Sequence, residues 1–221
     1  MKSNIDERTG KPKIILDLCG GTGSWSRPYR EAGYDVRLVT LPDGDVRTYT
    51  PPANVYGILA APPCTEFSLA KGGLPRDFEA GMETVVACMQ IIWQCRKRDK
   101  LVFWALENPK GLLRQFLGRP HFTFEHWEFD PDAQMYKPTD LWGYFTEPRP
   151  TCTVRPKIAL QPSNNGRRQC AAYDKRRSSC GVMMWQNDMC PPEYKDLKLS
   201  RAAIRAITPR GFAEAFFKAN R

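Results

Sequence analysis

The sequence lacks several features that would assign it to common classes. No apolar run approaches the roughly 20 residues that a membrane-spanning helix needs. The first 13 residues are polar and contain no apolar core, so we expect no secretory signal. The eight cysteines include no CxxC pair, the spacing typical of zinc and redox motifs. These absences favour a cytoplasmic protein with free thiols and no membrane partner.

The positive charge is confined to the last third of the chain. The protein has 221 residues and a formal net charge of +9. Residues 1–150 hold 19 basic and 19 acidic side chains, whereas residues 151–221 hold 14 basic and 5 acidic ones. A basic segment attached to a neutral body indicates a polyanionic partner, nucleic acid first, although a merely solvated face is the alternative.

Short apolar runs alternate with helical patterns, which predicts an α/β fold with a largely parallel sheet. We expect a catalytic core over residues 1–145, a small, irregular and basic excursion over 146–200, and a C-terminal helix over 201–221 that returns to the core. The expected strands are 13–18, 35–40, 55–60, 101–106 and 122–129; the expected helices are 24–33, 78–100 and 110–118, with a last one opened by Thr208-Pro209.

A glycine-rich segment, Asp17-Leu-Cys-Gly-Gly-Thr-Gly23, follows the first expected strand and precedes a helix. Glycine allows the backbone to turn tightly and to approach a ligand, and the following helix N-terminus favours anions. This context favours a nucleotide-like cofactor at the carboxyl end of the sheet. The spacing differs from the dinucleotide pattern GxGxxG, and a simple tight turn is the alternative.

Two further motifs follow later strands. Pro62-Pro63-Cys64 ends the third strand on a stiff loop, where a thiolate can act as a nucleophile; a small buried cysteine is the alternative. Glu107-Asn108-Pro109 ends the fourth, and a glutamate whose pKa is raised by burial can exchange a proton with a substrate. A glutamate at the start of a helix is the alternative there.

The three motifs, in this order, resemble those of the DNA cytosine-5 methyltransferases, in a compact form of phage or prokaryotic type. The resemblance covers roughly residues 13–145 and the last helix. It implies a Rossmann-like class I methyltransferase sheet, the cofactor S-adenosylmethionine and a DNA substrate whose cytosine is flipped out of the helix. Cys64 would add to C6 of that base, and Glu107 would hydrogen-bond its N3/N4 edge.

The resemblance also assigns supporting roles by position. Asn108 and Ser68 join Cys64 and Glu107 in the catalytic set, and Ser68 opens a loop that closes over the base. The implied cofactor contacts are Asp17, Cys19, Gly20, Gly21, Thr22, Gly23, Trp25, Asp45 and Pro62. The implied nucleic-acid contacts are Lys71, Lys137, Arg167, Arg168, Lys175, Arg176 and Arg177.

The sequence departs from the family pattern at several positions. Cys19 stands where the family has phenylalanine, so Trp25 either replaces that stacking partner or belongs to the core. Thr40 stands where an acid binds the ribose. The QxRxR motif is missing, and Lys137 is the candidate for its arginine, with a solvated turn lysine as the alternative. Asp45 is either the adenine contact or a plain turn residue.

The small size of the excursion leaves the substrate open. RNA or a free cytosine nucleotide remains an alternative to DNA, a modified S-adenosylmethionine an alternative cofactor, and a non-catalytic nucleic-acid-binding protein an alternative class. The spacings within the excursion, 18, 10 and 10 residues, do not match those of zinc ligands, so we expect no metal. The cysteines concerned are Cys152, Cys170, Cys180 and Cys190.

Overall fold

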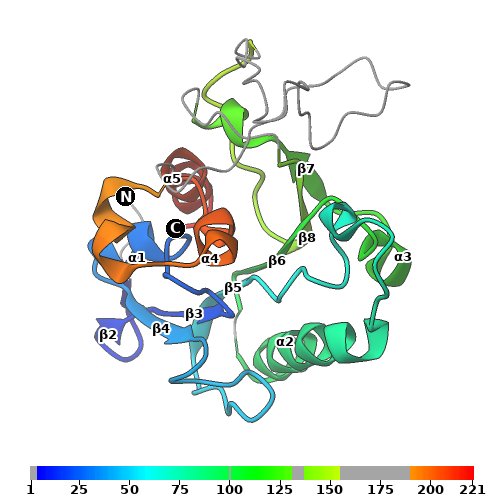
Figure 1. Cartoon of the computed structure of the whole chain (residues 1–221). Coiled ribbons are helices and arrows are strands. Elements are labelled where there is room, and N and C mark those ends of the chain that lie inside the picture. Colours follow the sequence, from blue (N-terminus) through cyan, green and yellow to red (C-terminus); the bar gives the residue numbers. More distant parts are fainter. Residues whose placement is uncertain (1–3, 100, 131–136, 155–189) are drawn as a thin grey trace.

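A six-stranded mixed sheet forms the centre of the protein (Figure 1). The computed structural model describes residues 4–99, 101–130, 137–154 and 190–221. The strand order is β4-β3-β5-β6-β8-β7, with the first four strands parallel to one another and β8 antiparallel to both β6 and β7. The strands are β3 (Ile14–Leu18), β4 (Asp35–Val39), β5 (Val55–Ala60), β6 (Phe103–Pro109), β7 (Phe122–Phe124) and β8 (Thr139–Tyr144).

Helices cover both faces of this sheet, which is an α/β architecture compatible with a Rossmann-like fold (Figure 1). The long helix α2 (Phe78–Arg98) lies on one face, and α1 (Arg27–Glu31), α4 (Arg201–Ala206) and α5 (Arg210–Ala219) lie on the other. The remaining elements are the hairpin β1 (Ile5–Asp6) and β2 (Lys11–Pro12), the short helix α3 (Arg114–Leu117), and 3-10 turns at Leu69–Lys71, His126–Glu128 and Pro192–Leu197.

Alternating side chains of the strands build two separate cores. Leu16 and Ile58 face α2, where they meet Val85 and Ile92. Ile15 faces the opposite way and belongs to an aromatic cluster with residues of α1 and α5. Both faces of the central strands are therefore buried, as the continuous apolar runs in the sequence predicted.

The strand order reverses between β3 and β5. From β3 the chain moves outward to β4, and then returns to β5 on the other side of β3 and continues to β6. In open α/β sheets, ligands bind at such a switch point, in the crevice beyond the carboxyl ends of the strands. The glycine-rich motif follows β3 and the Pro-Pro-Cys motif follows β5, so both lie at this position.

Most of the expected elements are confirmed, and the differences have physical reasons. The strands β3, β4 and β5, the helix α2 and the final helix form as predicted, whereas the expected helices 24–33 and 110–118 are shorter, at Arg27–Glu31 and Arg114–Leu117. The prediction that β6 ends at Leu106 was wrong, because Glu107–Pro109 continue the strand by pairing with β8. Strand β8 and helix α4 were not predicted, and the expected strand 122–129 ends at Phe124.

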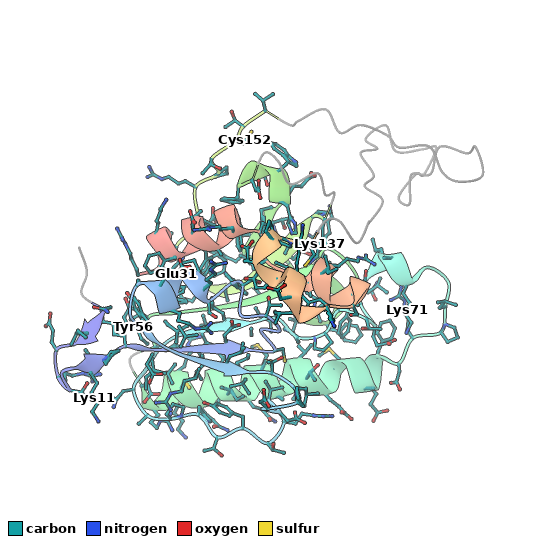
Figure 2. The ribbon with its side chains drawn as sticks, turned by 60° about the vertical axis from the view of Figure 1, so that its left-hand side comes forward. Lys11, Glu31, Tyr56, Lys71, Lys137 and Cys152 are labelled. Carbon is teal, nitrogen blue, oxygen red and sulfur yellow. The ribbon has the colours of Figure 1, made fainter. Side chains whose placement is uncertain are left out.

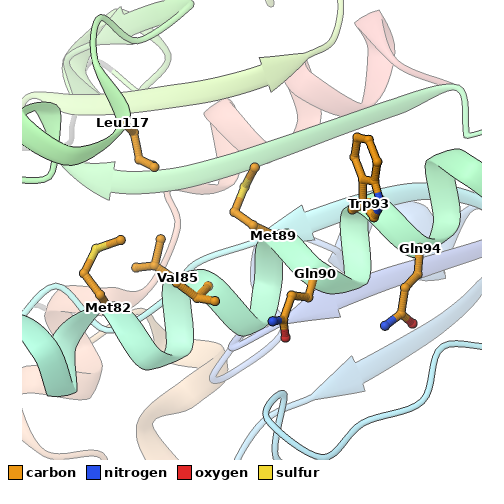
Figure 3. Close-up of a pocket in the computed structure, with 8 residues that line it drawn as sticks. Met82, Val85, Met89, Gln90, Trp93, Gln94 and Leu117 are labelled. Atoms are coloured by element: carbon orange, nitrogen blue, oxygen red, sulfur yellow. The ribbon is translucent and has the colours of Figure 1, made fainter.

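An apolar groove runs along α2 on the side that faces Leu117 of α3 (Figure 3). It has a volume of about 670 Å³ and is lined by side chains of α2 between Met82 and Gln94 and by Leu117 of α3. Among the described residues that line it, none belongs to the predicted site. None of the described helices is both long enough and apolar enough to cross a membrane.

Candidate active site

The three motifs meet at the carboxyl edge of the parallel strands. Leu18 pairs with Ala60, and Ala60 pairs with Leu106. The residues that follow these three positions, Cys19, Ala61 and Glu107, therefore emerge side by side at one edge of the sheet. The sequence places all three motifs at strand ends, and the parallel register brings them together.

Asp17 lies buried beneath the glycine-rich turn. Its carboxylate accepts a hydrogen bond of 2.5 Å from Ser26 Oγ, while its other oxygen, Oδ1, has no hydrogen-bond partner among the described residues. Burial raises the pKa of Asp17 to about 6, against the lowering effect of Ser26. A Cβ atom at Gly20 would lie 2.3 Å from this oxygen, so only glycine fits over the carboxylate.

The turn itself is strained at Cys19. Its φ of +56° is the left-handed conformation that non-glycine residues rarely adopt, and Gly21 and Gly23 follow with φ of +56° and +69°. The Cys88 thiol of α2 lies against Cys19 and lowers its pKa, whereas burial and Cys19 raise that of Cys88. Thr22 is half-buried in the same turn.

Two predicted cofactor contacts have partners within the protein. Trp25 is only 2% exposed and packs edge-on against Phe216, with ring centres 5.3 Å apart, so it lies in the core. The Asp45 carboxylate accepts hydrogen bonds from Arg47, which lowers its pKa. The ring faces of Trp25 are therefore closed off by the core, although its Nε1–H has no hydrogen-bond partner among the described residues, and the Asp45 carboxylate is shared with Arg47.

The C-terminal helices and the segment between them cover one side of the glycine-rich turn. The backbone N–H of Thr208, between α4 and α5, donates to Ser24 Oγ at 2.9 Å. Phe212 of α5 packs against Trp25 and stacks on Phe124 of β7 at 3.9 Å between ring centres. The end of the chain thereby becomes one wall of the region around the turn.

Cys64 is half-buried at the start of a tight turn. Its carbonyl oxygen accepts hydrogen bonds from the N–H groups of Phe67 at 3.0 Å and Ser68 at 2.8 Å. Burial raises the pKa of the Cys64 thiol, as does the nearby Glu107, whereas the positive charges of Lys137 and Arg205 lower it. The thiol and these three charged groups therefore occupy one neighbourhood.

Glu107 faces the same neighbourhood from β6. Its side chain is 19% exposed, and burial raises its pKa, with Lys137 acting in the opposite direction. Lys137 Nζ lies 4.0 Å from the Glu107 carboxylate and donates to the carbonyl of Arg205 at 3.0 Å. Beside them, burial and Lys137 keep the pKa of His126 well below its ordinary value. Figure 2 shows Lys137 beside α4.

Asn108 connects the second and third motifs. It is fully buried, and its side-chain Nδ2 donates to the carbonyl oxygen of Pro62 at 3.0 Å. Pro62 is itself buried, directly before Pro63-Cys64. Asn108 therefore ties the cysteine loop to the strand that carries Glu107, while its Oδ1 has no hydrogen-bond partner among the described residues.

The loop after Cys64 carries the other predicted contacts. Ser68 begins the 3-10 turn Leu69–Lys71, and its hydroxyl accepts from the N–H of Ala70. Lys71, labelled in Figure 2, forms an ion pair with Glu66 and is 19% exposed. Its ammonium is therefore already paired with a carboxylate in this structure.

The remaining predictions concern the basic excursion. Cys152 and Cys190 are described, and across residues 4–99, 101–130, 137–154 and 190–221 no group of three or more possible metal ligands occurs. Cys170 and Cys180 lie outside the described residues, as do the predicted nucleic-acid contacts Arg167, Arg168, Lys175, Arg176 and Arg177.

Sequence reasoning missed three contributors to the site. Arg205 comes from the unpredicted helix α4, Arg76 bonds to backbone carbonyls of the loop after Cys64, and Glu66 pairs with Lys71. Five charged side chains occur from Lys195 to Arg205, and this cluster could have indicated that Arg205 belongs to the site. Nothing in the spacing of Arg76 or Glu66 indicated their contacts.

Comparison with known families finds no matching family model, and no curated protein matches the chain.

Proposed function

We propose that the protein is an S-adenosylmethionine-dependent methyltransferase that modifies C5 of cytosine in DNA. The observation that carries the proposal is the meeting of Cys64, Glu107 and Lys137 next to the Asp17–Gly23 turn at the switch point of the sheet. A thiol, a carboxyl group with a raised pKa and a glycine-rich turn are the three parts that this reaction needs. The motif order in the sequence supports the same assignment.

The residues around the turn fit a bound S-adenosylmethionine in part. Asp17 offers an unsatisfied buried acceptor, and Gly20 keeps the space above it free of side-chain atoms. Gly21, Gly23 and Pro62 would line the pocket, and Asp45 would have to share its carboxylate with Arg47. When bound, the cofactor supplies an electrophilic methyl group at the carboxyl edge of the sheet.

The chain's own residues would then act on the cytosine. The Cys64 thiol would release its proton to solvent as its sulfur forms a bond to C6, and the electron pair of the C5–C6 double bond would move to C5. C5 would take the methyl group and leave the cofactor without it. Loss of the C5 proton and cleavage of the sulfur–C6 bond restore the aromatic ring and free Cys64. Glu107, whose raised pKa favours the protonated form, holds a proton at N3 and draws electron density from C6. The base must leave the stack for C6 to be reached.

The test is methyl transfer from labelled cofactor to cytosine-containing DNA. We expect incorporation by the wild type and none by Cys64→Ala. Cys152→Ala is the matched control, because Cys152 is also partly exposed and its thiol donates to the carbonyl of Val154, away from Cys64 and Glu107. Equal incorporation by wild type and Cys64→Ala would refute the mechanism.

A panel of substrates in the same assay identifies the acceptor. Duplex DNA, single-stranded DNA, RNA and dCMP are compared at equal cytosine concentration. Activity on RNA alone or on dCMP alone would mean that this substrate, and not DNA, is the methyl acceptor. DNA containing 5-fluorocytosine should form a covalent adduct through Cys64, since fluorine cannot leave C5 as a proton does.

One observation favours a second candidate, a non-catalytic nucleic-acid-binding protein. The aromatic ring of Trp25 is buried and the Asp45 carboxylate is paired, so two implied contacts to the adenosine part of the cofactor are occupied within the protein. Calorimetry distinguishes the two functions: tight DNA binding without any heat of cofactor binding would support the second one.

A further inference from the structure

The loop between Cys64 and α2 is organised around one guanidinium group, that of Arg76. Arg76 Nη1 donates to the carbonyl of Glu66 at 2.6 Å, and Nη2 donates to the carbonyls of Ser68 at 2.9 Å and Gly72 at 3.4 Å. Arg76 is half-buried, at the end of the loop that it binds. One side chain therefore satisfies three backbone acceptors of the segment that it follows.

Two of these acceptors, the carbonyls of Glu66 and Ser68, belong to the turn that begins at Cys64. The N–H groups of Phe67 and Ser68 donate to the carbonyl of Cys64, and Arg76 holds the carbonyls of Glu66 and Ser68. The peptide between Glu66 and Phe67 therefore accepts from the guanidinium with its C=O and donates to the Cys64 carbonyl with its N–H. A shift of Arg76 can therefore reach Cys64 through a single peptide unit.

Glu66 fixes the outer part of the same loop. Its carboxylate pairs with Lys71 and accepts from the N–H of Asp77 at 2.8 Å, which lowers its pKa. Its side chain lies against the first turn of α2, where a Cβ atom at Gly81 would come within 2.9 Å of Glu66 Cβ. The loop is thus attached to α2 at both Arg76 and Glu66.

We propose that Arg76 is a positioning residue for Cys64, which fixes the thiol at the edge of the sheet by bridging the backbone carbonyls of its loop. The role of Cys64 as nucleophile rests on the proposed function, whereas the bridging geometry does not. Arg76 acts through hydrogen bonds of the backbone and contacts no reacting atom.

The shape of the guanidinium is essential to this role. Its planar fork directs several N–H groups at fixed angles, so it can hold separate carbonyls at once. A lysine at the same position carries the charge, but its three N–H donors share one nitrogen atom and lack the fixed planar fork. We therefore expect Arg76→Lys to lose most of the effect and Arg76→Ala to lose all of it.

Arg98 provides a matched control at the other end of α2. Its guanidinium donates to the carbonyls of Pro51 and Pro52 and pairs with Asp99. Arg98→Ala therefore also removes an arginine that binds loop carbonyls, but at the opposite end of the helix from the Cys64 loop. A general loss of stability should be similar in both variants.

The experiment measures the alkylation rate of Cys64 by iodoacetamide in the full-length protein, without cofactor or DNA. Trypsin releases residues 48–71 as one peptide in which Cys64 is the only cysteine, so mass spectrometry follows this thiol alone. Because the loss of Arg76 frees the turn to open locally, we expect about tenfold faster alkylation in Arg76→Ala. Arg76→Lys should lie near it, and Arg98→Ala should match the wild type.

Added guanidinium at millimolar concentration should slow the alkylation of Arg76→Ala again, by occupying the vacated position. Wild-type rates in Arg76→Ala and Arg76→Lys, or an equal acceleration in Arg98→Ala, would overturn the proposal. If Arg76→Ala does not fold, Arg76→Lys decides the question. Failure of methyl transfer in every substrate would refute the proposed function and leave the alkylation result unaffected.

Discussion

Replacing Asp17 by asparagine should change how the stability of the protein depends on pH. The carboxylate is fully buried, and its pKa rises from 3.8 to about 6 because the charged form is desolvated. One unit of pKa is worth roughly 1.4 kcal/mol, so keeping this group ionised above pH 6 costs about 3 kcal/mol. Asparagine has nearly the same shape and carries no charge.

The sign of the effect follows from which state holds the proton. Between about pH 4 and pH 6 the folded protein keeps the Asp17 proton while the unfolded chain has released it, so wild-type stability falls as the pH rises through this window. Above pH 6 the Asp17 carboxyl is ionised in both the folded and the unfolded state, and the stability of the wild type falls no further. The stability of Asp17→Asn relative to wild type should therefore rise by about 3 kcal/mol between pH 4 and pH 6 and then level off.

Urea denaturation at pH values from 4 to 8 measures this difference. Asp35→Asn is the control, because Asp35 lies on the adjacent strand in an exposed ion pair with Arg37, and such pairs contribute about 0–1 kcal/mol. A difference between Asp17→Asn and wild type that stays constant with pH would refute the reasoning. It would mean that the Asp17 carboxylate is not desolvated as its burial indicates.

Three other substitutions test the site and the core. Glu107→Gln keeps the shape of the side chain but cannot supply a proton, so labelled methyl transfer should fall by about 10²–10⁴-fold while the unfolding midpoint stays unchanged or rises; unchanged transfer would exclude an acid role. Asn108→Ala removes the donor to the Pro62 carbonyl and should cost about 1–3 kcal/mol in urea denaturation, with faster alkylation of Cys64; an unaffected alkylation rate would contradict its link to the loop. Phe212→Ala leaves a cavity between Trp25 and Phe124 and should lower the free energy of unfolding, measured in urea, by about 3–5 kcal/mol. A loss below about 1 kcal/mol would show that α5 is dispensable for the core.

The central elements could be predicted from the sequence because they depend on local patterns. The apolar runs at Ile14–Leu18 and Val55–Ala60 and the helical spacing in Phe78–Arg98 are sufficient to identify β3, β5 and α2. Their parallel order then places the glycine-rich turn and Cys64 at one edge of the sheet. This part of the candidate site required no knowledge of distant contacts.

The elements that were missed depend on partners far away in the chain. Strand β8 contains Asp140, which looks unsuitable for a buried strand, but Arg114 binds its carboxylate with two hydrogen bonds of 2.6 and 2.5 Å. The extension of β6 through Glu107 and Asn108 is possible only because β8 pairs with it. No local sequence pattern indicates the Arg114–Asp140 ion pair or the pairing of β6 with β8.

The contact partners of charged residues were the hardest feature to predict from the sequence. Lys71 was expected to face nucleic acid, but Glu66, five residues earlier, pairs with it in this structure. Trp25, two residues before α1, was open to two interpretations because a tryptophan at this position suits both a ligand and a core. The decision came from the packing of Phe216, nearly 200 residues later.

The position of α5 has a consequence for the order of folding. Phe212 and Phe216 pack against the sheet and against Trp25, and Thr208 bonds to the turn that follows β3. Residues at opposite ends of the sequence therefore complete one structure. Contacts of such long sequence separation form late, because closing the intervening loop is entropically costly. During synthesis the apolar face of β3 and β5 stays uncovered until α5 has emerged. Aggregation of nascent chains should therefore compete with folding at this stage, and a chaperone that shields this face would raise the yield.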